Sequence, residues 1–402
     1  MRIVHVTREL GTDRRYGIGR SLSPVILALA DMGHEVRYLT QDDQTPRSSE
    51  LQRGWIDRLG RWARRLWGPA PAVLAAVWLE RLNMGRLAAK LAHQMRADVV
   101  HMHDPLIAWG FRLARLRYPS PALCWGLSLH GFGAYSDAIG EEGVPYTPRL
   151  LRWQRRMEAR ILEAADFVIC PTHSGRRQLA RDLALPRPAP HWHVVPHARP
   201  VLNLPCRDDA RRALGWETSA VHLLAVGRLN PVKRFDRLVR ACGLTGRPVQ
   251  LTILAEGDEH VGRHLHELAA QSPGLSLAVH PVDDISPYLA AADLYISTAR
   301  NESFGLANLE AVTAGLPAVC TAVGAVPEVV GACARLVPGG DEGLEPAMAQ
   351  AISELLDDLP RRVRMGLDGR RWAHSVPLAA TVAEQLCDVY AGRAPTAWTT
   401  DV

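Results

Sequence analysis

The sequence predicts an α/β protein made of two doubly wound domains, and three observations lead to this prediction. The chain has 402 residues, which is more than one hydrophobic core commonly serves. Hydrophobic residues make up 47% and charged residues 22% of the chain, the balance of a protein that buries large cores. Short apolar runs alternate with longer helical patterns in both halves, which is typical of βαβ units with parallel strands.

In the first half, short apolar runs are predicted strands, and helical patterns separate them. The predicted strands are 3–6, 35–40, 98–102, 123–129, 167–170 and 194–195, and the predicted helices include 20–32, 108–117 and 149–165. A segment rich in proline and histidine, 191–205, predicts a linker because proline ends regular structure.

After this linker, the second half shows the same alternation of short apolar runs and helical patterns. Its predicted strands are 221–226, 249–254, 275–279, 294–297, 318–320 and 335–337. We therefore expect two Rossmann-like domains, 1–198 and 199–375, facing across a cleft, and a C-terminal helix within 376–402 that packs back toward the first domain. Because parallel sheets bind ligands outside the carboxyl ends of their strands, strand-to-helix loops are expected to line the cleft.

Composition limits the location of the protein and its partners. The start lacks the longer apolar region of a secretory signal, and the most apolar run, 71–79, is less than half of the roughly 20 residues that cross a bilayer. The seven cysteines contain no CxxC pair, which predicts reduced thiols rather than a disulfide framework or a zinc site. These features favour a cytoplasmic protein.

Charge is unevenly divided between the halves. The first 200 residues hold 29 Lys+Arg against 18 Asp+Glu, whereas the remainder holds 18 against 24. A basic first half is compatible with anionic lipid, nucleic acid or an anionic acceptor, and charge alone does not choose among them.

The motif GRLNPVK follows the first strand of the second half and carries two cations, Arg228 and Lys233. Cations at the carboxyl end of a strand can bind a diphosphate, and the arginine fork suits its oxygens. The chain has only two lysines, Lys90 and Lys233, and uses arginine almost everywhere else. A compact ammonium at position 233 therefore favours a specific role over that of a generic surface charge.

The motif ESFGLANLE places Glu302 and Glu310 on either side of Gly305. If a helix begins near this glycine, its free amides can hold a leaving phosphate. Glu310 would then lie inside the helix, where a carboxylate can accept hydrogen bonds from ribose hydroxyls. The alternative is an ordinary helix that is capped by Ser303.

Three further motifs carry weaker signals. His130 ends an apolar strand beside Gly131 and Gly133, from which it can hydrogen-bond a sugar. The segment YGIGR, with Gly17 and Gly19, permits close approach of the backbone to a ligand but lacks the GxGxxG spacing of a dinucleotide fingerprint. His101 and His103 face the same way on a strand, yet no third metal ligand is evident nearby in the sequence, so we expect no metal.

Residues 53–68, RGWIDRLGRWARRLWG, combine tryptophan and leucine at helical spacing with arginines on the other faces. Such a helix can lie on an anionic membrane surface. The equal alternative is a helix that packs on the first domain with solvated arginines.

With these motifs in place, the chain resembles the retaining GT-B glycosyltransferases of family four, glycosyl transferases group 1, over nearly its whole length. The resemblance rests on the glycine loop, LALADMGHEV, ADVVHMHDP, His130, GRLNPVK, the Glu302-to-Glu310 unit and GAVPEVV, in family order. GRLNPVK and the glutamate pair are fairly specific together.

The resemblance implies a role for each matching residue. Arg228 and Lys233 would bind the donor diphosphate, Glu310 would hold the ribose, and Glu302 and His130 would contact the transferred sugar. The backbone amides of Phe304, Gly305 and Leu306 would complete the cradle. The resemblance further implies a hexosyl donor such as a UDP-sugar or GDP-sugar, no cofactor and no nucleic acid partner. The acceptor would be a glycan, a lipid-linked molecule or a small molecule.

The chain also departs from the family pattern. Arg234 follows Lys233 where glycine is frequent, so the phosphate loop could take another course. Two alternatives to a transferase stay open at this stage: a nucleotide-sugar epimerase on the same fold, and a non-catalytic regulator that binds a sugar nucleotide.

Overall fold

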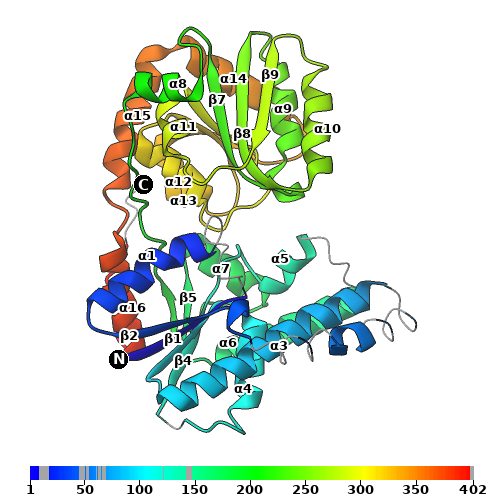
Figure 1. Ribbon diagram of the computed structural model, residues 1–402, viewed down its shortest axis with the longest axis vertical. Coiled ribbons are helices and arrows are strands. Elements are labelled where there is room, and N and C mark those ends of the chain that lie inside the picture. The colour runs from blue at the N-terminus through cyan, green and yellow to red at the C-terminus, as the bar shows by residue number, and fades with distance from the viewer. Residues whose placement is uncertain are drawn as a thin grey trace. The chain divides into compact units, whose positions relative to one another are not determined.

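The computed structural model describes most of the chain and divides it into two compact units. The described residues are 1–8, 18–44, 50, 54–59, 61, 65, 69–120, 122–141 and 147–398. Unit 1 consists of Met1–Ala198 together with Ala379–Trp398, and unit 2 of Arg199–Leu378. Each unit holds one six-stranded parallel sheet with helices on its faces (Figure 1).

The sheet of unit 1 has the strand order β2-β1-β3-β4-β5-β6, with all neighbours parallel. The strands are β1 (Arg2–Val6), β2 (Glu35–Leu39), β3 (Val99–Met102), β4 (Cys124–Ser128), β5 (Phe167–Cys170) and β6 (Trp192–Val194). The chain order reverses between β1 and β3, so the loops after these two strands flank the switch point, where doubly wound sheets bind ligands.

Helices cover both faces of this sheet, because alternate strand residues are apolar on either side. The helices of unit 1 are α1 (Ile18–Asp31), α3 (Pro69–Met95), α4 (Pro105–Ala114), α5 (Tyr135–Glu141), α6 (Pro148–Glu163), α7 (His173–Asp182) and α16 (Ala379–Tyr390), with a short 3-10 turn η1 (Gln41–Asp43). Val4 packs in one core with α3, α4, α6 and α7. Its neighbour Ile3 packs in a second core with α1 and α16.

The sheet of unit 2 has the order β12-β11-β10-β7-β8-β9, in which the first strand of the unit lies centrally. The strands are β7 (His222–Leu229), β8 (Val249–Gly257), β9 (Leu275–His280), β10 (Leu294–Ser297), β11 (Ala318–Ala322) and β12 (Ala334–Pro338). Here the chain order reverses between β7 and β10, which is the topology of the Rossmann fold.

The helices of unit 2 follow its strands in regular alternation. They are α8 (Arg207–Leu214), α9 (Phe235–Gly243), α10 (Glu259–Ala269), α11 (Ser286–Ala291), α12 (Leu306–Ala314), α13 (Val326–Val330), α14 (Leu344–Asp357) and α15 (Leu359–Ala373), with 3-10 turns η2 (Pro231–Lys233) and η3 (Gly331–Cys333). The predicted α/β class with two parallel sheets is therefore confirmed.

The predicted linker at 191–205 begins too early. Residues Trp192–Val194 form β6 and pair with Val168–Cys170 of β5. The histidines around this strand suggested a loop, but the alternation of Trp192 and Val194 buries two large apolar side chains in the sheet.

In the described part of the chain, no helix combines the length and the apolar character that crossing a bilayer requires.

Candidate active site

The loops that flank the switch point of unit 2 carry the predicted donor-binding residues. Arg228 lies near the end of β7 and its side chain is exposed, while Lys233 ends η2 a few residues later. Glu302 follows β10, the strand next to β7. Neighbouring parallel strands end at the same edge of a sheet, so residues 69 positions apart in sequence meet here.

Lys233 and Glu302 form an ion pair through Nζ and Oε1. Both side chains are largely buried, with 21% of Lys233 and 13% of Glu302 exposed. The stem of Lys233 runs along Gly227, where an added Cβ would lie 3.1 Å from its Cε. The lysine is thus held at the sheet edge with its charge already matched by a carboxylate.

The loop after Lys233 takes the conformation that glycine would favour, although Arg234 occupies it. Arg234 has φ 51° and ψ 42°, a left-handed conformation that costs an ordinary side chain about 1–2 kcal/mol. Its guanidinium compensates by donating to Asp341 at 2.8 Å and to the Gly339 carbonyl at 2.9 Å. The single O–H of Thr298 is shared between the carbonyl oxygens of Lys233 and Arg234, which lie 3.1 and 3.0 Å away. These contacts hold Arg234 in a conformation that glycine adopts more readily.

Helix α12 begins at Leu306, as the sequence predicted. Gly305 precedes it with φ 80°, so the helix is capped by a left-handed glycine and not by Ser303. An added Cβ at Gly305 would lie 2.9 Å from the Asn308 side-chain nitrogen, so the first turn closes tightly over this position. Phe304, which precedes this glycine, is fully buried.

Glu310 lies on α12 with 3% of its surface exposed. Burial raises the pKa of the Tyr295 hydroxyl, and the neighbouring Cys320, Glu302 and Glu310 act in the same direction. Tyr295 donates to Asn308 Oδ1 at 3.0 Å, which ties β10 to α12. Neither Tyr295 nor Asn308 was predicted, because a buried tyrosine in an apolar strand is usually a core residue.

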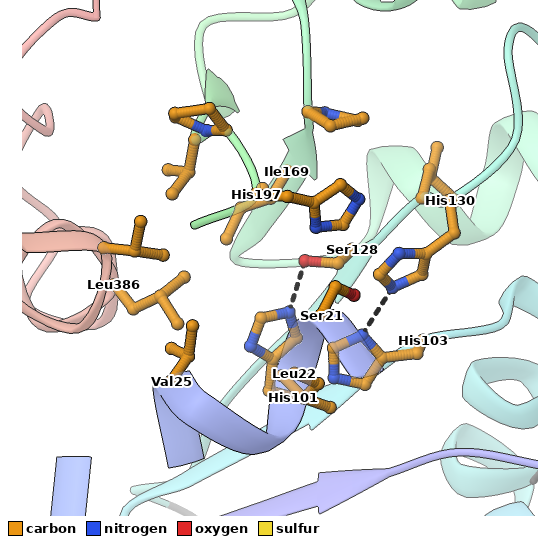
Figure 2. A pocket seen from close by; sticks show the side chains of 15 residues that line it. Ser21, Leu22, Val25, His101, His103, Ser128, His130, Ile169, His197 and Leu386 are labelled. Carbon is orange, nitrogen blue, oxygen red and sulfur yellow. Dashed lines mark hydrogen bonds between the residues drawn. The ribbon is translucent and has the colours of Figure 1, made fainter. Parts of the chain in front are cut away.

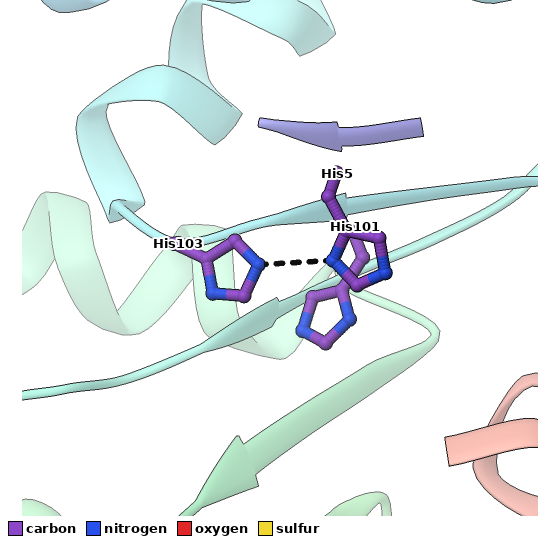
Figure 3. Close-up of side chains that lie close together, drawn as sticks. All are labelled: His5, His101 and His103. Carbon is purple, nitrogen blue, oxygen red and sulfur yellow. Dashed lines mark hydrogen bonds between the residues drawn. The ribbon is translucent and has the colours of Figure 1, made fainter. Parts of the chain in front are cut away.

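In unit 1, a cluster of buried histidines lies at the switch point between β1 and β3. His5 is the register partner of His101, and His103 follows at the end of β3 (Figure 3). His5 Nδ1 and His103 Nε2 are 3.1 Å apart and share a hydrogen bond. His103 Nδ1 and His130 Nε2 are 2.8 Å apart and share another, so the predicted His130 joins this cluster (Figure 2).

A small cavity of about 40 Å³ lies beside these histidines, on the face of the sheet that α1 and α16 cover. His130 and His197 line it, with their rings 5.5 Å apart and nearly parallel. Ser21 of α1 and Leu386 of α16 line the same cavity (Figure 2).

Burial keeps the histidines of this cluster neutral. It lowers the pKa of His5 to about 3, and together with the neighbouring His197 it lowers the pKa of His130 to about 3. Burial lowers the pKa of His197 to about 4. The pKa of His103 is lowered well below its usual value by burial and by His101.

Three of these histidines are the residues that could hold a metal ion in the described part of the chain. One ring nitrogen each of His5, His101 and His103 lies within 4.8 Å of the others. The third candidate ligand, His5, was missed because it lies in an apolar strand far away in sequence. Hydrogen bonds occupy both nitrogens of His101, to Ser128 and Tyr390 at 2.7 Å each, so an ion would have to displace one of them. The arrangement favours a hydrogen-bonded network.

Asp104, the last residue of the HMHD motif, makes no hydrogen bond to these histidines among the described residues. It caps α4 by accepting from the Leu106 amide at 2.7 Å and forms a buried ion pair with Arg81 at 3.0 Å. The HMHD motif is therefore split between the histidine network and a helix cap.

Two predicted features fall partly outside the described residues. Gly17 lies outside them, and Gly19 is buried in the first turn of α1, so the glycine segment is not wholly a loop as expected. Of the segment 53–68, the described residues include a helical stretch at 54–59, in which the Trp55 side chain is 54% exposed. Its contact with a membrane stays a prediction.

Two doubly wound parallel α/β units in one chain are the architecture of the GT-B class of glycosyltransferases. The family model for glycosyl transferases group 1 matches residues 220–358, and that for a glycosyl transferase 4-like domain matches residues 16–198. The chain belongs to the group 1 glycosyltransferases, family 4.

Related sequences align with most of the chain. The D-inositol 3-phosphate glycosyltransferase of Kineococcus radiotolerans is 32% identical over 336 residues, which cover 76% of this chain and 74% of that protein. The enzyme of the same name from Thermobispora bispora is 27% identical over an alignment of 412 residues, which includes 94% of this chain and 90% of that protein.

Solved structures share the fold. Sucrose-phosphate synthase from Thermosynechococcus elongatus has a TM-score of 0.72 at 19% identity and covers 97% of this chain and 98% of its own. Anabaena HepE in complex with UDP and glucose has a TM-score of 0.69 at 16% identity and covers 97% and 99%.

Proposed function

We propose that this glycosyltransferase transfers a hexosyl group from a UDP-sugar or GDP-sugar to a sugar-containing or small-molecule acceptor, with retention of anomeric configuration and without a metal ion. The observation that carries the proposal is the pairing of Lys233 with Glu302 at the switch point of unit 2. It provides a cation for the diphosphate and an acid for the sugar at one edge of one sheet.

In this proposal unit 2 holds the nucleotide. Lys233 and the exposed Arg228 bind the diphosphate, helped by the free amides at the start of α12. Glu310, buried on the same helix, accepts hydrogen bonds from the ribose hydroxyls. Anabaena HepE has been solved with UDP and with UDP-glucose, which supports a uridine nucleotide as the donor to test first.

The reaction breaks the bond between the anomeric carbon and the diphosphate oxygen, and forms a bond from the same carbon to an acceptor oxygen. The charge that develops on the departing diphosphate is what Lys233 and Arg228 stabilise, so they act mainly on the transition state. The acceptor attacks the face that the diphosphate leaves, and a phosphate oxygen takes the acceptor proton. Glu302 and His130 contact the sugar that is transferred.

The acceptor is proposed to bind unit 1, since the basic first 200 residues suit an anionic molecule. The relatives named D-inositol 3-phosphate glycosyltransferases make an inositol phosphate the first acceptor to test.

The first test is Lys233→Ala. We expect kcat/KM for the sugar nucleotide to fall by a factor of at least about 100, equivalent to roughly 2.7 kcal/mol of lost transition-state stabilisation. Lys90→Ala is the matched control, because Lys90 is the other lysine of the chain and lies exposed on α3. Full activity in the Lys233 variant would defeat the diphosphate assignment.

The second test identifies the product. With UDP-glucose and D-inositol 3-phosphate, proton NMR of the product is expected to show the same α-anomeric configuration as the donor. A β-linked product would contradict retention. Conversion of the donor to an epimer without any acceptor would identify an epimerase, and donor binding without turnover across a panel of acceptors would identify a regulator.

A further inference from the structure

The bonded histidines of unit 1 form a chain of three rings that begins in the first strand and ends at His130. His5 of β1 bonds to His103 after β3, and His103 bonds to His130 after β4, over 3.1 and 2.8 Å. The ring planes of His5 and His103 differ by 20° and those of His103 and His130 by 34°, angles at which in-plane lone pairs can meet. His103 thus uses both of its nitrogens, one toward each neighbour.

A neutral chain of this kind has only two proton arrangements. Each neutral imidazole carries one proton, and each bond needs one donor and one acceptor. If His103 carries its proton on Nδ1, then His5 and His130 also carry theirs on Nδ1. If His103 carries it on Nε2, all three protons move to Nε2. The tautomer of His130 is therefore tied to that of His5, two rings away.

His5, at the other end of the three bonded histidines from His130, distinguishes the two proton arrangements. His5 is fully buried, and its Nε2 has no hydrogen-bond partner among the described residues. In the Nε2 arrangement this atom would carry a buried N–H without an acceptor, a situation that folded proteins rarely tolerate. In the Nδ1 arrangement it carries only a bare lone pair. The Nδ1 arrangement is therefore favoured.

We propose that His103 and His5 are positioning residues that hold His130 in the Nδ1–H tautomer, so that His130 meets the transferred sugar as a hydrogen-bond donor. This inference rests on the proposed function, in which His130 contacts the sugar. His103 Nδ1 orients the His130 ring by donating to His130 Nε2. His5 sets the direction of donation along the three histidines by donating from Nδ1 to His103 Nε2.

His101 supplies the matched control. Its ring lies 4.6 Å from that of His103, centroid to centroid, but its hydrogen bonds go to Ser128 and Tyr390. It shares the strand, the burial and the chemistry of His103 without belonging to the chain.

The experiment reads the tautomers directly in the full-length protein. Long-range proton–nitrogen NMR of ¹⁵N-histidine-labelled protein distinguishes a protonated ring nitrogen from a bare one, and loss of a signal in His130→Gln assigns that residue. We expect Nδ1–H for His130 in the wild type and in His101→Gln. In His103→Phe and His5→Phe we expect averaged nitrogen shifts at His130. The two variants remove different rings from the histidine chain, so either variant alone tests the inference if the other does not fold.

Kinetics connect the tautomer to the reaction. We expect His103→Phe to lower kcat about tenfold while KM for the donor changes less than twofold, because a contact that strengthens in the transition state is lost. His103→Gln is expected to restore the fixed tautomer and most of kcat, since its carboxamide can accept from His5 and donate to His130.

Two outcomes would overturn the inference. One is an Nε2–H tautomer of His130 in the wild type, and the other is a His103→Phe protein that loses the fixed tautomer yet keeps the wild-type kcat. Failure of the proposed function is distinguishable, since it would show as full activity of Lys233→Ala whatever the histidine signals do.

Discussion

At the scale of single residues, Lys233 is neutralised before any ligand arrives. Its partner Glu302 is the acid that we assign to the transferred sugar, and both side chains are mostly buried. A diphosphate that binds Lys233 therefore competes with a carboxylate already in place, and that carboxylate also repels the incoming anion. In the proposed site, this ion pair would set how tightly the leaving nucleotide is held.

Glu302→Gln tests this competition. We expect UDP or GDP, whichever the wild type binds, to bind the variant about 3 to 10 times more tightly, because the amide keeps the shape but removes the negative charge. Turnover of the sugar nucleotide should fall, since the contact to the sugar changes. Isothermal titration calorimetry gives the dissociation constants, and Glu267→Gln, an exposed acid on α10, is the control. An unchanged affinity for the nucleotide would show that the ion pair does not oppose binding.

The sequence shows which residues of this site carry charge but not which of them touch. Lys233 and Glu302 could be picked out because lysine is scarce and because their motifs follow strands. Their contact could not, since it depends on β7 and β10 being neighbours in the sheet. His5 could not be identified at all, because a histidine within an apolar strand looks like part of the core until β1 pairs with β3.

At the scale of elements, helices α3 and α4 cross at two glycines. An added Cβ at Gly85 would lie 2.3 Å from the Ile107 carbonyl oxygen, and one at Gly110 would lie 2.6 Å from the Leu82 carbonyl oxygen. The backbones therefore touch without intervening side chains. Such contact positions Asp104, the cap of α4, close to Arg81 on α3.

Gly85→Ala should push these helices apart. We expect a loss of about 2 kcal/mol in the free energy of unfolding, because overpacking exceeds the gain in helix propensity. For a unit of this size the loss corresponds to a fall in Tm of about 5 °C by calorimetry. Gly54→Ala is the control, since Gly54 is helical and has nothing within 4 Å of an added Cβ. Equal Tm values for the two variants would contradict the close crossing.

The order of elements was largely predictable, and their lengths were less so. The twelve predicted strands all correspond to observed strands, because period and flanking residues define them locally. Helix α3 was not among the helices named from the sequence: its segment 71–79 is almost wholly apolar and has no 3.6-residue period to recognise. Helix α3 as a whole packs against α4, β1 and β3, and this packing is not visible in the sequence.

At the scale of the whole molecule, the C-terminal helix belongs to unit 1, although the residues that precede it in sequence form unit 2. Helix α16 packs with α1 in the second core of unit 1, through Val382, Leu386 and Val389. The Tyr390 hydroxyl shares a hydrogen bond with His101 Nδ1, so the C-terminal helix also contacts the cluster of buried histidines. The stability of unit 1 therefore depends on groups that are buried in neutral form.

These buried histidines make the stability of unit 1 depend on pH. His5 has a pKa of about 3 when folded against 6.5 when unfolded, so below pH 6.5 the unfolded state binds the extra proton and stability falls as pH falls. Glu158 acts in the opposite direction. Burial raises its pKa from 4.5 to about 7, so its protonation favours the folded state as pH falls toward 4.5. The wild type alone therefore shows only the net effect.

The informative measurement is the difference between the wild type and His5→Phe. Between pH 7.5 and 5 the wild type should lose about 2 kcal/mol more of its unfolding free energy than the variant, because 1.5 pH units below 6.5 correspond to that amount for one histidine. Urea unfolding followed by circular dichroism at both pH values gives these energies, and Glu158→Gln should shift the dependence in the opposite sense. If the wild type and His5→Phe lose equal stability on acidification, His5 is not held neutral in the folded protein.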